Sequence, residues 1–119
     1  MRFLGLVRGA ENQGAPPAAL MEAMQKFIAE SLKNGSLVQT GGLAPSSQAS
    51  RIRLSGGKLR VVDGPFAEAK EVVGGYAIME APTRAAAEDH MRRFMKLHED
   101  HWPEWEGESE LREMVFVTP

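Results

Sequence analysis

The chain has 119 residues, no cysteine, and 14 Lys and Arg side chains against 16 Asp and Glu, so its formal net charge is −2. This length predicts one domain over residues 1–119, and the lack of cysteine excludes disulfides, thiolate metal sites and cysteine nucleophiles. The balanced charge argues against binding to nucleic acid, which needs clustered Lys and Arg, and no apolar run is long enough for a signal peptide or a membrane span. We therefore expect a cytoplasmic protein that binds neither nucleic acid nor membrane.

The chain opens with a predicted strand over Arg2–Arg8 that has two apolar faces. Successive side chains of a strand point to opposite faces, so Phe3 and Val7 lie on one side while Leu4 and Leu6 lie on the other. This pattern indicates a sheet that is covered on both sides.

Apolar residues at three- and four-residue spacing predict a helix between residues 16 and 34. The Pro16–Pro17 pair suits the first turn of a helix, where no N–H donor is needed, and Asn34–Gly35 is typical of a helix end. A second strand is predicted over Leu37–Gly42, followed by a loop over residues 43–50. The apolar stripe of the helix consists of Leu20, Met21, Met24, Phe27, Ile28 and Leu32.

Two short alternating strands, Arg51–Ser55 and Lys58–Asp63, surround Gly56–Gly57 and predict a hairpin with a two-residue turn. This register places Arg53 directly opposite Arg60. Like charges at opposed positions destabilise a sheet. We therefore expect an acidic group to neutralise the pair: a glutamate from the C-terminal segment, a carboxylate of a second subunit, or an anionic ligand. The alternative is that solvent alone screens the two charges.

Asp63-Gly64-Pro65-Phe66 predicts a turn in which Phe66 pins the turn to the core. A further strand, apolar on both faces, is predicted over Val72–Glu80. Thr83 is expected to cap a second helix that ends before Pro103, and Leu111–Val117 is predicted to be the last strand. The buried stripe of the second helix consists of Ala87, Met91, Phe94, Leu97 and His98.

The resulting order is β-α-β-(β-β)-β-α-β, which without the inserted hairpin is the order of a ferredoxin-like α+β fold. Two helices can cover only one face of the sheet. Because two strands carry apolar residues on the other face as well, that open sheet face predicts an interaction surface. We expect a homodimer that stacks sheet to sheet; the alternative is a monomer whose second face is only mildly apolar.

Topology also predicts where a site would lie, because the loop at residues 9–15, the segment 63–71 and the segment 98–106 all reach the same end of such a domain. A concave apolar surface with a few convergent polar groups is typical of small-molecule sites. The polar and aromatic residues expected at this end are Glu11, Asp63, Glu68, Lys70, His98, His101, Trp102 and Trp105.

His98 and His101 lie one helical turn apart and could share a metal ion or transfer a proton. Two His residues are an incomplete ligand set, and His also suits a helix C-terminus on electrostatic grounds, so we expect no bound metal. Trp102 and Trp105 could stack on a planar ligand or pack the corner between helix and strand.

A tight turn requires neither Glu68 nor Lys70. Glu68 is therefore a candidate general base and Lys70 a candidate electrostatic stabiliser, with a solvated surface pair as the alternative. Asp63 and Phe66 are candidate ligand contacts, although Asp63 also suits the geometry of the turn. No organic cofactor is expected.

The segment from Asp63 to Tyr76 reads Asp-Gly-Pro-Phe-Ala-Glu-Ala-Lys-Glu-Val-Val-Gly-Gly-Tyr and resembles the pattern DGPF-x-E-x-K-E…GG-[YF] of the DGPF (YCII-related) domain family. The resemblance implies a dimeric α+β barrel and a link to extracytoplasmic-function sigma factors. It implies no particular chemistry, since the wider superfamily includes lyases, isomerases, dehalogenases and oxygenases. No His precedes His90, so the His-based acid–base pair of plain YCII proteins is not implied.

Two functions stay open. The first is a small-molecule-binding or accessory module; the second is a small-molecule enzyme of the lyase, isomerase or hydrolase type that uses carboxylate and imidazole groups, with Glu68, His98 and His101 as catalytic candidates. A purely structural oligomerisation domain is a third interpretation. No acid–base pair is dictated by spacing, which favours binding.

Overall fold

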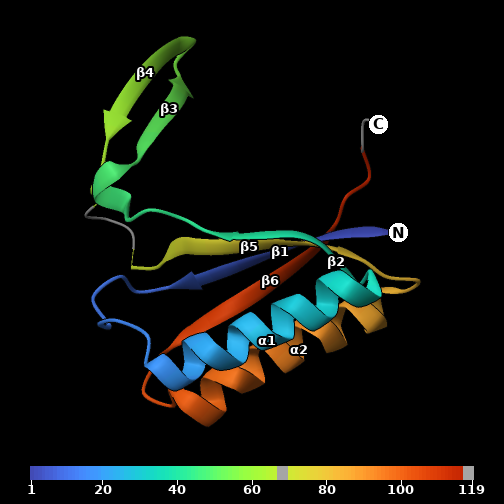
Figure 1. The fold of residues 1–119 in the computed structure, drawn as a ribbon. Helices are drawn as coiled ribbons and strands as arrows, with labels where there is room; N and C mark the ends of the chain where they lie inside the picture. Colours follow the sequence, from blue (N-terminus) through green and yellow to red (C-terminus); the bar gives the residue numbers. More distant parts are fainter. Residues whose placement is uncertain (67–69, 117–119) are drawn as a thin grey trace.

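The computed structural model describes residues 1–66 and 70–116, and this part of the chain forms six strands, two α-helices and one 3-10 turn (Figure 1). The elements follow one another in the predicted order. Their bounds are β1 (Arg2–Gly9), α1 (Ala18–Asn34), β2 (Leu37–Gly42), η1 (Ser46–Gln48), β3 (Ser50–Ser55), β4 (Lys58–Asp63), β5 (Val72–Glu80), α2 (Arg84–His101) and β6 (Gly107–Glu113).

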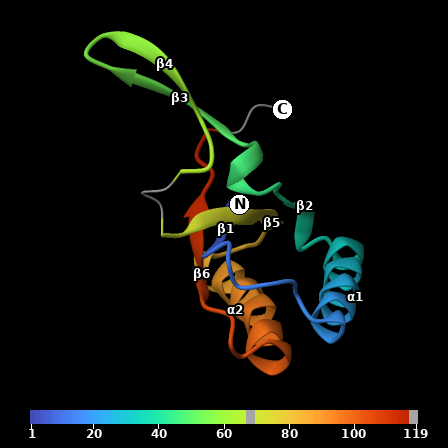
Figure 2. The same cartoon turned by 90° about the vertical axis from the view of Figure 1, so that its left-hand side faces the viewer.

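Four of the strands form one antiparallel sheet in the order β2-β5-β1-β6, and β3 pairs with β4 alone. Without the β3–β4 hairpin this order is that of a ferredoxin-like unit. The predicted α+β class and the β-α-β-(β-β)-β-α-β order are therefore confirmed. Both helices lie against the same side of the sheet (Figures 1 and 2).

The helices are capped by the residues that the sequence predicts at their ends. Thr83 caps α2, because its Oγ1 accepts a hydrogen bond from the Ala86 N–H at 3.1 Å. Gly35 ends α1 with a left-handed φ of 83°, a conformation that glycine adopts without steric cost. Within the described ranges, no helix is long and apolar enough to cross a lipid bilayer.

The core lies between the helices and one face of the sheet. The middle of β1 comes so close to α2 that a Cβ on Gly5 would lie 2.8 Å from the Met91 sulfur, so a larger residue there would require the Met91 side chain to shift. The buried residues of α1 are Leu20 and Ser31. Met21 and Leu32, which the sequence predicted to be buried, are exposed. The central cluster consists of Phe3, Leu37, Met79, Ala81, Ala87 and Met91.

The last strand was expected at Leu111–Val117 and is found at Gly107–Glu113. Its first residues, Gly-Glu-Ser-Glu, have low intrinsic strand propensity, and they pair because β1 supplies an antiparallel edge from Phe3 to Gly9. Tertiary pairing thus overrides local preference. Val117 lies outside the described residues.

The β3–β4 hairpin projects away from the sheet and the helices (Figures 1 and 2). Both residues of its turn, Gly56 and Gly57, have positive φ values of 60° and 77°, which matches the twist of a hairpin. One face of the hairpin is apolar and lies in solvent, with 66–74% of each residue exposed. These four side chains are Ile52, Leu54, Leu59 and Val61.

On the other face of the hairpin Arg53 is paired with Arg60, as predicted. Both side chains are exposed. Among the residues that the structure describes, neither guanidinium forms an ion pair with an acidic side chain. The expected neutralisation by a glutamate of the same chain is therefore not found, while screening by solvent, a second subunit and an anionic ligand remain as alternatives.

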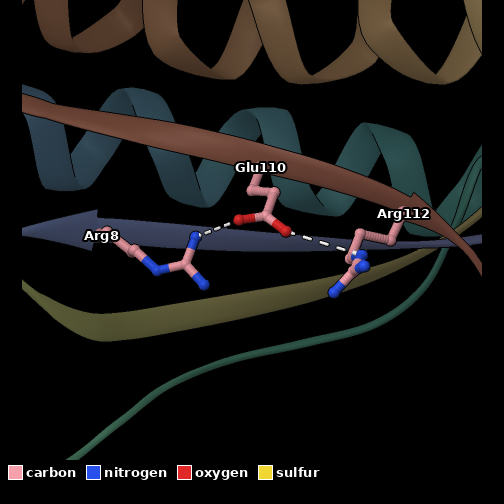
Figure 3. A network of polar contacts seen from close by, with 3 residues as sticks. All are labelled: Arg8, Glu110 and Arg112. Carbon is pink, nitrogen blue, oxygen red and sulfur yellow. Dashed lines mark hydrogen bonds and ion pairs between the residues drawn. The ribbon is translucent and has the colours of Figure 1, made fainter.

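The sheet face opposite the helices is apolar at Leu4 and Leu6 of β1 but charged at Arg8, near the end of the same strand, and along β6. Glu110 forms ion pairs with Arg8 at 2.5 Å and with Arg112 at 3.6 Å (Figure 3). This network lies beside Leu4 and Leu6, which pair with Arg112 and Glu110 in the register and are half-buried. The face is therefore amphipathic, whereas its β1 and β5 residues alone predicted an apolar one.

Candidate functional site

Two neighbouring hollows lie between the sheet, the helices and the loops. The interhelical cavity, about 250 Å³, is bounded by Met24, Phe27, Tyr76, His90, Met91 and Phe94. The end cleft, about 330 Å³, is bounded by Gly9, Glu11, Pro45, Val73 and Trp105. Val7, Gly74 and His98 line both, so these residues form the border between them.

The loop after β1 is held against the corner before β6 by a single side chain, Gln13. Its Nε2 donates hydrogen bonds to the carbonyl oxygens of Ala10 at 3.0 Å and Glu106 at 2.8 Å, and its Oε1 accepts from the Glu106 N–H at 2.7 Å. Two of the three predicted segments, 9–15 and 98–106, are thereby brought together. The amide of Gln13 uses both donor and acceptor, which a carboxylate or an ammonium group could not do.

Glu11 ties the same loop to the segment after β2. Its carboxylate accepts hydrogen bonds from the Ser46 N–H at 2.7 Å and from the Ser46 hydroxyl. Both hydrogen bonds lower the pKa of Glu11, the one from the Ser46 hydroxyl more than the one from the Ser46 N–H. This side chain therefore stays ionised. A carboxylate that is engaged in this way stabilises the rim of the cleft and is poorly suited to accept a proton from a ligand.

Trp105 is positioned by two glycines that face each other across the β1–β6 pair. Gly9 is the register partner of Gly107, and the indole packs over both. A Cβ on Gly9 would lie 3.0 Å from the ring, and a Cβ on Gly107 would collide with it. The indole in turn contacts the His98 imidazole, with ring centroids 4.7 Å apart.

Among the predicted candidates that the structure describes, His98 is the buried titratable residue, with 9% of its surface exposed. Its Nδ1 lies 3.2 Å from the Phe94 carbonyl oxygen. Because a carbonyl can only accept, Nδ1 carries the proton and Nε2 presents a lone pair. Burial lowers the pKa of His98, partly offset by the bond to Phe94, so the ring is neutral near pH 7.

The other aromatic and imidazole candidates of this segment lie farther out. Trp102 is half-buried and stacks on Trp105, with ring centroids 6.2 Å apart. His101 is exposed at the end of α2. Within residues 1–66 and 70–116, no group of three or more His, Cys, Asp or Glu side chains is close enough to hold a metal ion.

Of the candidates in the DGPF segment, those that the structure describes line neither hollow. Asp63 and Lys70 are exposed, and Glu68 lies outside the described residues. Phe66 is half-buried below the Arg51 guanidinium, 3.7 Å from the ring centroid, and does not belong to the core cluster. Phe66 therefore packs at the base of the hairpin, and the expectation that it pins the turn to the core is wrong.

The segment contributes indirectly through backbone packing. The Gly64 N–H donates to the Ala49 carbonyl oxygen at 2.8 Å, and a Cβ on Gly64 would collide with the Ser46 carbonyl group. Ser46 thus contacts both the DGPF turn and Glu11. Ser46 therefore joins the DGPF turn to the loop at residues 9–15, whereas segment 98–106 meets that loop through Gln13. Residues 43–45 and 72–74 contribute to the wall of the end cleft.

His90 is a buried residue that sequence analysis did not select. It is 6% exposed, lines the interhelical cavity and packs against Phe27 with ring centroids 4.9 Å apart. Its Nδ1 is buried without a hydrogen-bond partner. The signal was its position: His90 lies three residues after Ala87 and four before Phe94, on the predicted buried stripe.

Comparison with known proteins identifies a family but assigns no chemical activity. Residues 1–102 match the YCII-related domain family. An uncharacterized protein of Rhizobium meliloti (strain 1021) is 33% identical over 99 residues, a stretch that covers 83% of this chain and 73% of that protein.

Phe66→Ala is expected to lower the free energy of unfolding by about 1–2 kcal/mol, because a half-buried ring and one cation–π contact are lost. A fully buried Phe would cost about 3–5 kcal/mol. Urea denaturation gives the difference, and Phe66→Leu, which keeps most of the apolar area, is the matched control. A loss above about 3 kcal/mol would mean that Phe66 is buried in the protein in solution.

The free energy of unfolding should fall as the pH is lowered below about 6.5, the ordinary pKa of His. Burial lowers the pKa of His98 and, together with Arg93, that of His90, so the unfolded chain binds more protons in this window. Stability is complete above the unfolded pKa and is lost as the pH falls toward the folded values. His98→Asn should lose less stability than wild type between pH 7 and pH 5, while the exposed His101→Asn should follow wild type; equal slopes for all three proteins would refute this.

Proposed function

Because this chain belongs to the YCII-related domain family, we propose that it is a small-molecule-binding module whose ligand occupies the end cleft. The observation that carries the proposal is the state of His98: a buried, neutral imidazole with its proton held on Nδ1, at the border of two hollows. Such a ring offers one fixed acceptor, Nε2, in mostly apolar surroundings. This combination is typical of small-molecule sites.

The surroundings of His98 favour binding over catalysis. Chemistry that needs both an acid and a base would require a second titratable group beside the ligand. Among the described residues, Glu11 is the carboxylate that lines the cleft, and it is held by Ser46. The three hydrogen bonds of Gln13 hold two walls of the cleft together without a ligand, and such preorganisation lowers the entropy cost of binding. The module is thus built to surround a molecule.

An enzyme of the lyase, isomerase or hydrolase type is the second candidate, and one observation supports it. A neutral imidazole with a free Nε2 is the form that acts as a general base. In that case His98 would take the proton, and no organic cofactor would be required. Conversion of a bound compound, followed by NMR, separates the two functions.

We further propose that the module is a cytoplasmic homodimer in which the open sheet face and the hairpin arms are covered by a second copy. An isolated two-stranded hairpin is marginally stable in water, and exposed apolar patches mark interaction sites. Acidic neighbours would stabilise the Arg53–Arg60 pair, and Glu104, Glu106 and Glu108 are exposed on the same chain's last corner and strand. A partner copy would supply these carboxylates, as in the dimeric barrel that the resemblance implies.

The ligand proposal is tested with a set of hydroxylated and carboxylated aromatic fragments, detected through the His98 ring and Trp105 indole NMR signals. Compounds that bind should shift both sets of signals. His98→Asn keeps a donor for the Phe94 carbonyl but lacks Nε2, and should weaken binding at least about tenfold, or about 1.4 kcal/mol. His101→Asn is the control. Equal affinities for wild type and His98→Asn would contradict the proposal.

The dimer is tested by light scattering, which should give about twice the chain mass of 13.0 kDa at micromolar concentration. Ile52→Asp combined with Leu59→Asp places charge on the apolar hairpin face and should shift the mass toward one chain, while Ser55→Asp should not. A wild-type mass near 13.0 kDa would rule the dimer out.

A further inference from the structure

The end cleft carries a negative charge that no basic side chain of the same chain offsets. Among the described residues, Glu11 is the charged side chain in its wall, since the imidazole of His98 is neutral near pH 7. All Lys and Arg residues of the chain lie within residues 1–66 and 70–116, and none of them lines the cleft. The cleft is therefore complementary in charge to a cation.

The carboxylate of Glu11 lies where two walls of this cleft meet. It accepts hydrogen bonds from the N–H and the hydroxyl of Ser46, and Ala10 and Pro45, the sequence neighbours of these two residues, also line the cleft. Glu11 is exposed, and within the described part of the chain it forms no ion pair. Because each carboxylate oxygen can accept a second hydrogen bond, Glu11 is able to bind a cationic group.

The rest of the wall suits the apolar body of such a molecule. Trp105 is half-buried and lines the end cleft but not the interhelical cavity. Aromatic rings attract ammonium groups, and tryptophan does so most strongly. The cleft, of about 330 Å³, falls within the range of about 300–1,000 Å³ that is typical of small-molecule sites. Its other apolar side chains include Val7, Leu43, Ala44, Pro45, Val72 and Val73.

Anions and neutral molecules fit this cleft less well. An anion would face the Glu11 carboxylate without a Lys or Arg side chain to bind it, and like charges repel. A neutral alcohol can donate one hydrogen bond to the carboxylate. A protonated primary amine has three N–H donors and adds the attraction between opposite charges, which makes each hydrogen bond stronger.

We propose that the end cleft binds an organic amine in its protonated form, with the ammonium group at the Glu11 carboxylate and the apolar body against Trp105. The inference rests on the proposed function, because it names the class of molecule that the same cleft takes. It also predicts an order within the fragment set described above. Carboxylated fragments should bind less tightly than hydroxylated ones.

The test compares three probes that share a naphthalene ring and differ in charge: 2-naphthylmethylamine, which is protonated at neutral pH, 2-naphthylmethanol and 2-naphthoate. Titrations of wild type, followed through the Trp105 indole N–H signal in NMR spectra, give the three affinities. The amine should bind at least about fivefold more tightly than the alcohol, the gain expected of an exposed ion pair. The alcohol should bind more tightly than naphthoate.

Three variants separate the charge of Glu11 from its structural role. Glu11→Gln removes the charge and should bind the amine and the alcohol with similar affinity. Ser46→Ala removes the hydroxyl that holds the carboxylate but keeps the charge, so the amine should still bind more tightly than the alcohol. Glu30→Gln removes one negative charge at an exposed position of α1 outside the cleft, and its preference for the amine should match that of wild type.

Equal affinities of wild type for the amine and the alcohol, tighter binding of naphthoate, or no shift of the Trp105 signal would each overturn the inference. So would an unchanged preference in Glu11→Gln, or its loss in Ser46→Ala or Glu30→Gln. If hydroxylated fragments still bind through His98 in that event, the proposed function survives alone. If His98→Asn and wild type bind fragments equally while Glu11 still selects the amine, the amine site stands without the role proposed for His98.

Discussion

The pairing of β1 with β6 is the constraint on which the end of this domain depends. It places Gly9 opposite Gly107, and the flat patch that results is the only kind of surface over which the Trp105 indole can lie so close to the backbone. The indole then holds the His98 ring from one side while Phe94 binds it from the other. Strand register, not a binding motif, thus determines where the imidazole sits.

Sequence periodicity was sufficient for the fold because the relevant signals are local. The helix stripes, the Thr83 cap, Gly35 and the Gly56–Gly57 turn each act within a few residues. The predicted bounds of β6 differ from the observed ones because its first four residues resemble a loop in sequence. These residues form a strand because they pair with the edge of β1. Local propensity says little about such a segment.

The sequence predicted less of the candidate site than of the fold. Its supports join residues far apart in the chain, Gln13 with Glu106 and Glu11 with Ser46, and no spacing rule reports such pairs. Motif resemblance drew attention to Asp63, Phe66 and Lys70, which lie outside both hollows. His90 was overlooked because a His on a buried stripe looks like a packing residue until its unpaired nitrogen is seen.

The two hollows also imply a balance between stability and use. A cavity in the core and an unpaired imidazole nitrogen both reduce the free energy of folding, and natural proteins accept such losses where a site requires them. Both losses of stability arise at neighbouring hollows, whose walls share Val7, Gly74 and His98.

The projecting hairpin has a consequence that follows from symmetry. In a closed two-fold assembly the interface is isologous, so every side chain of one arm recurs in the other. A substitution at Leu54 or Leu59 would then be felt twice, and a change of about 1.4 kcal/mol per side chain would alter the association constant about a hundredfold. Small inherited changes in these few exposed residues would be enough to separate closely related chains into pairs that do not mix.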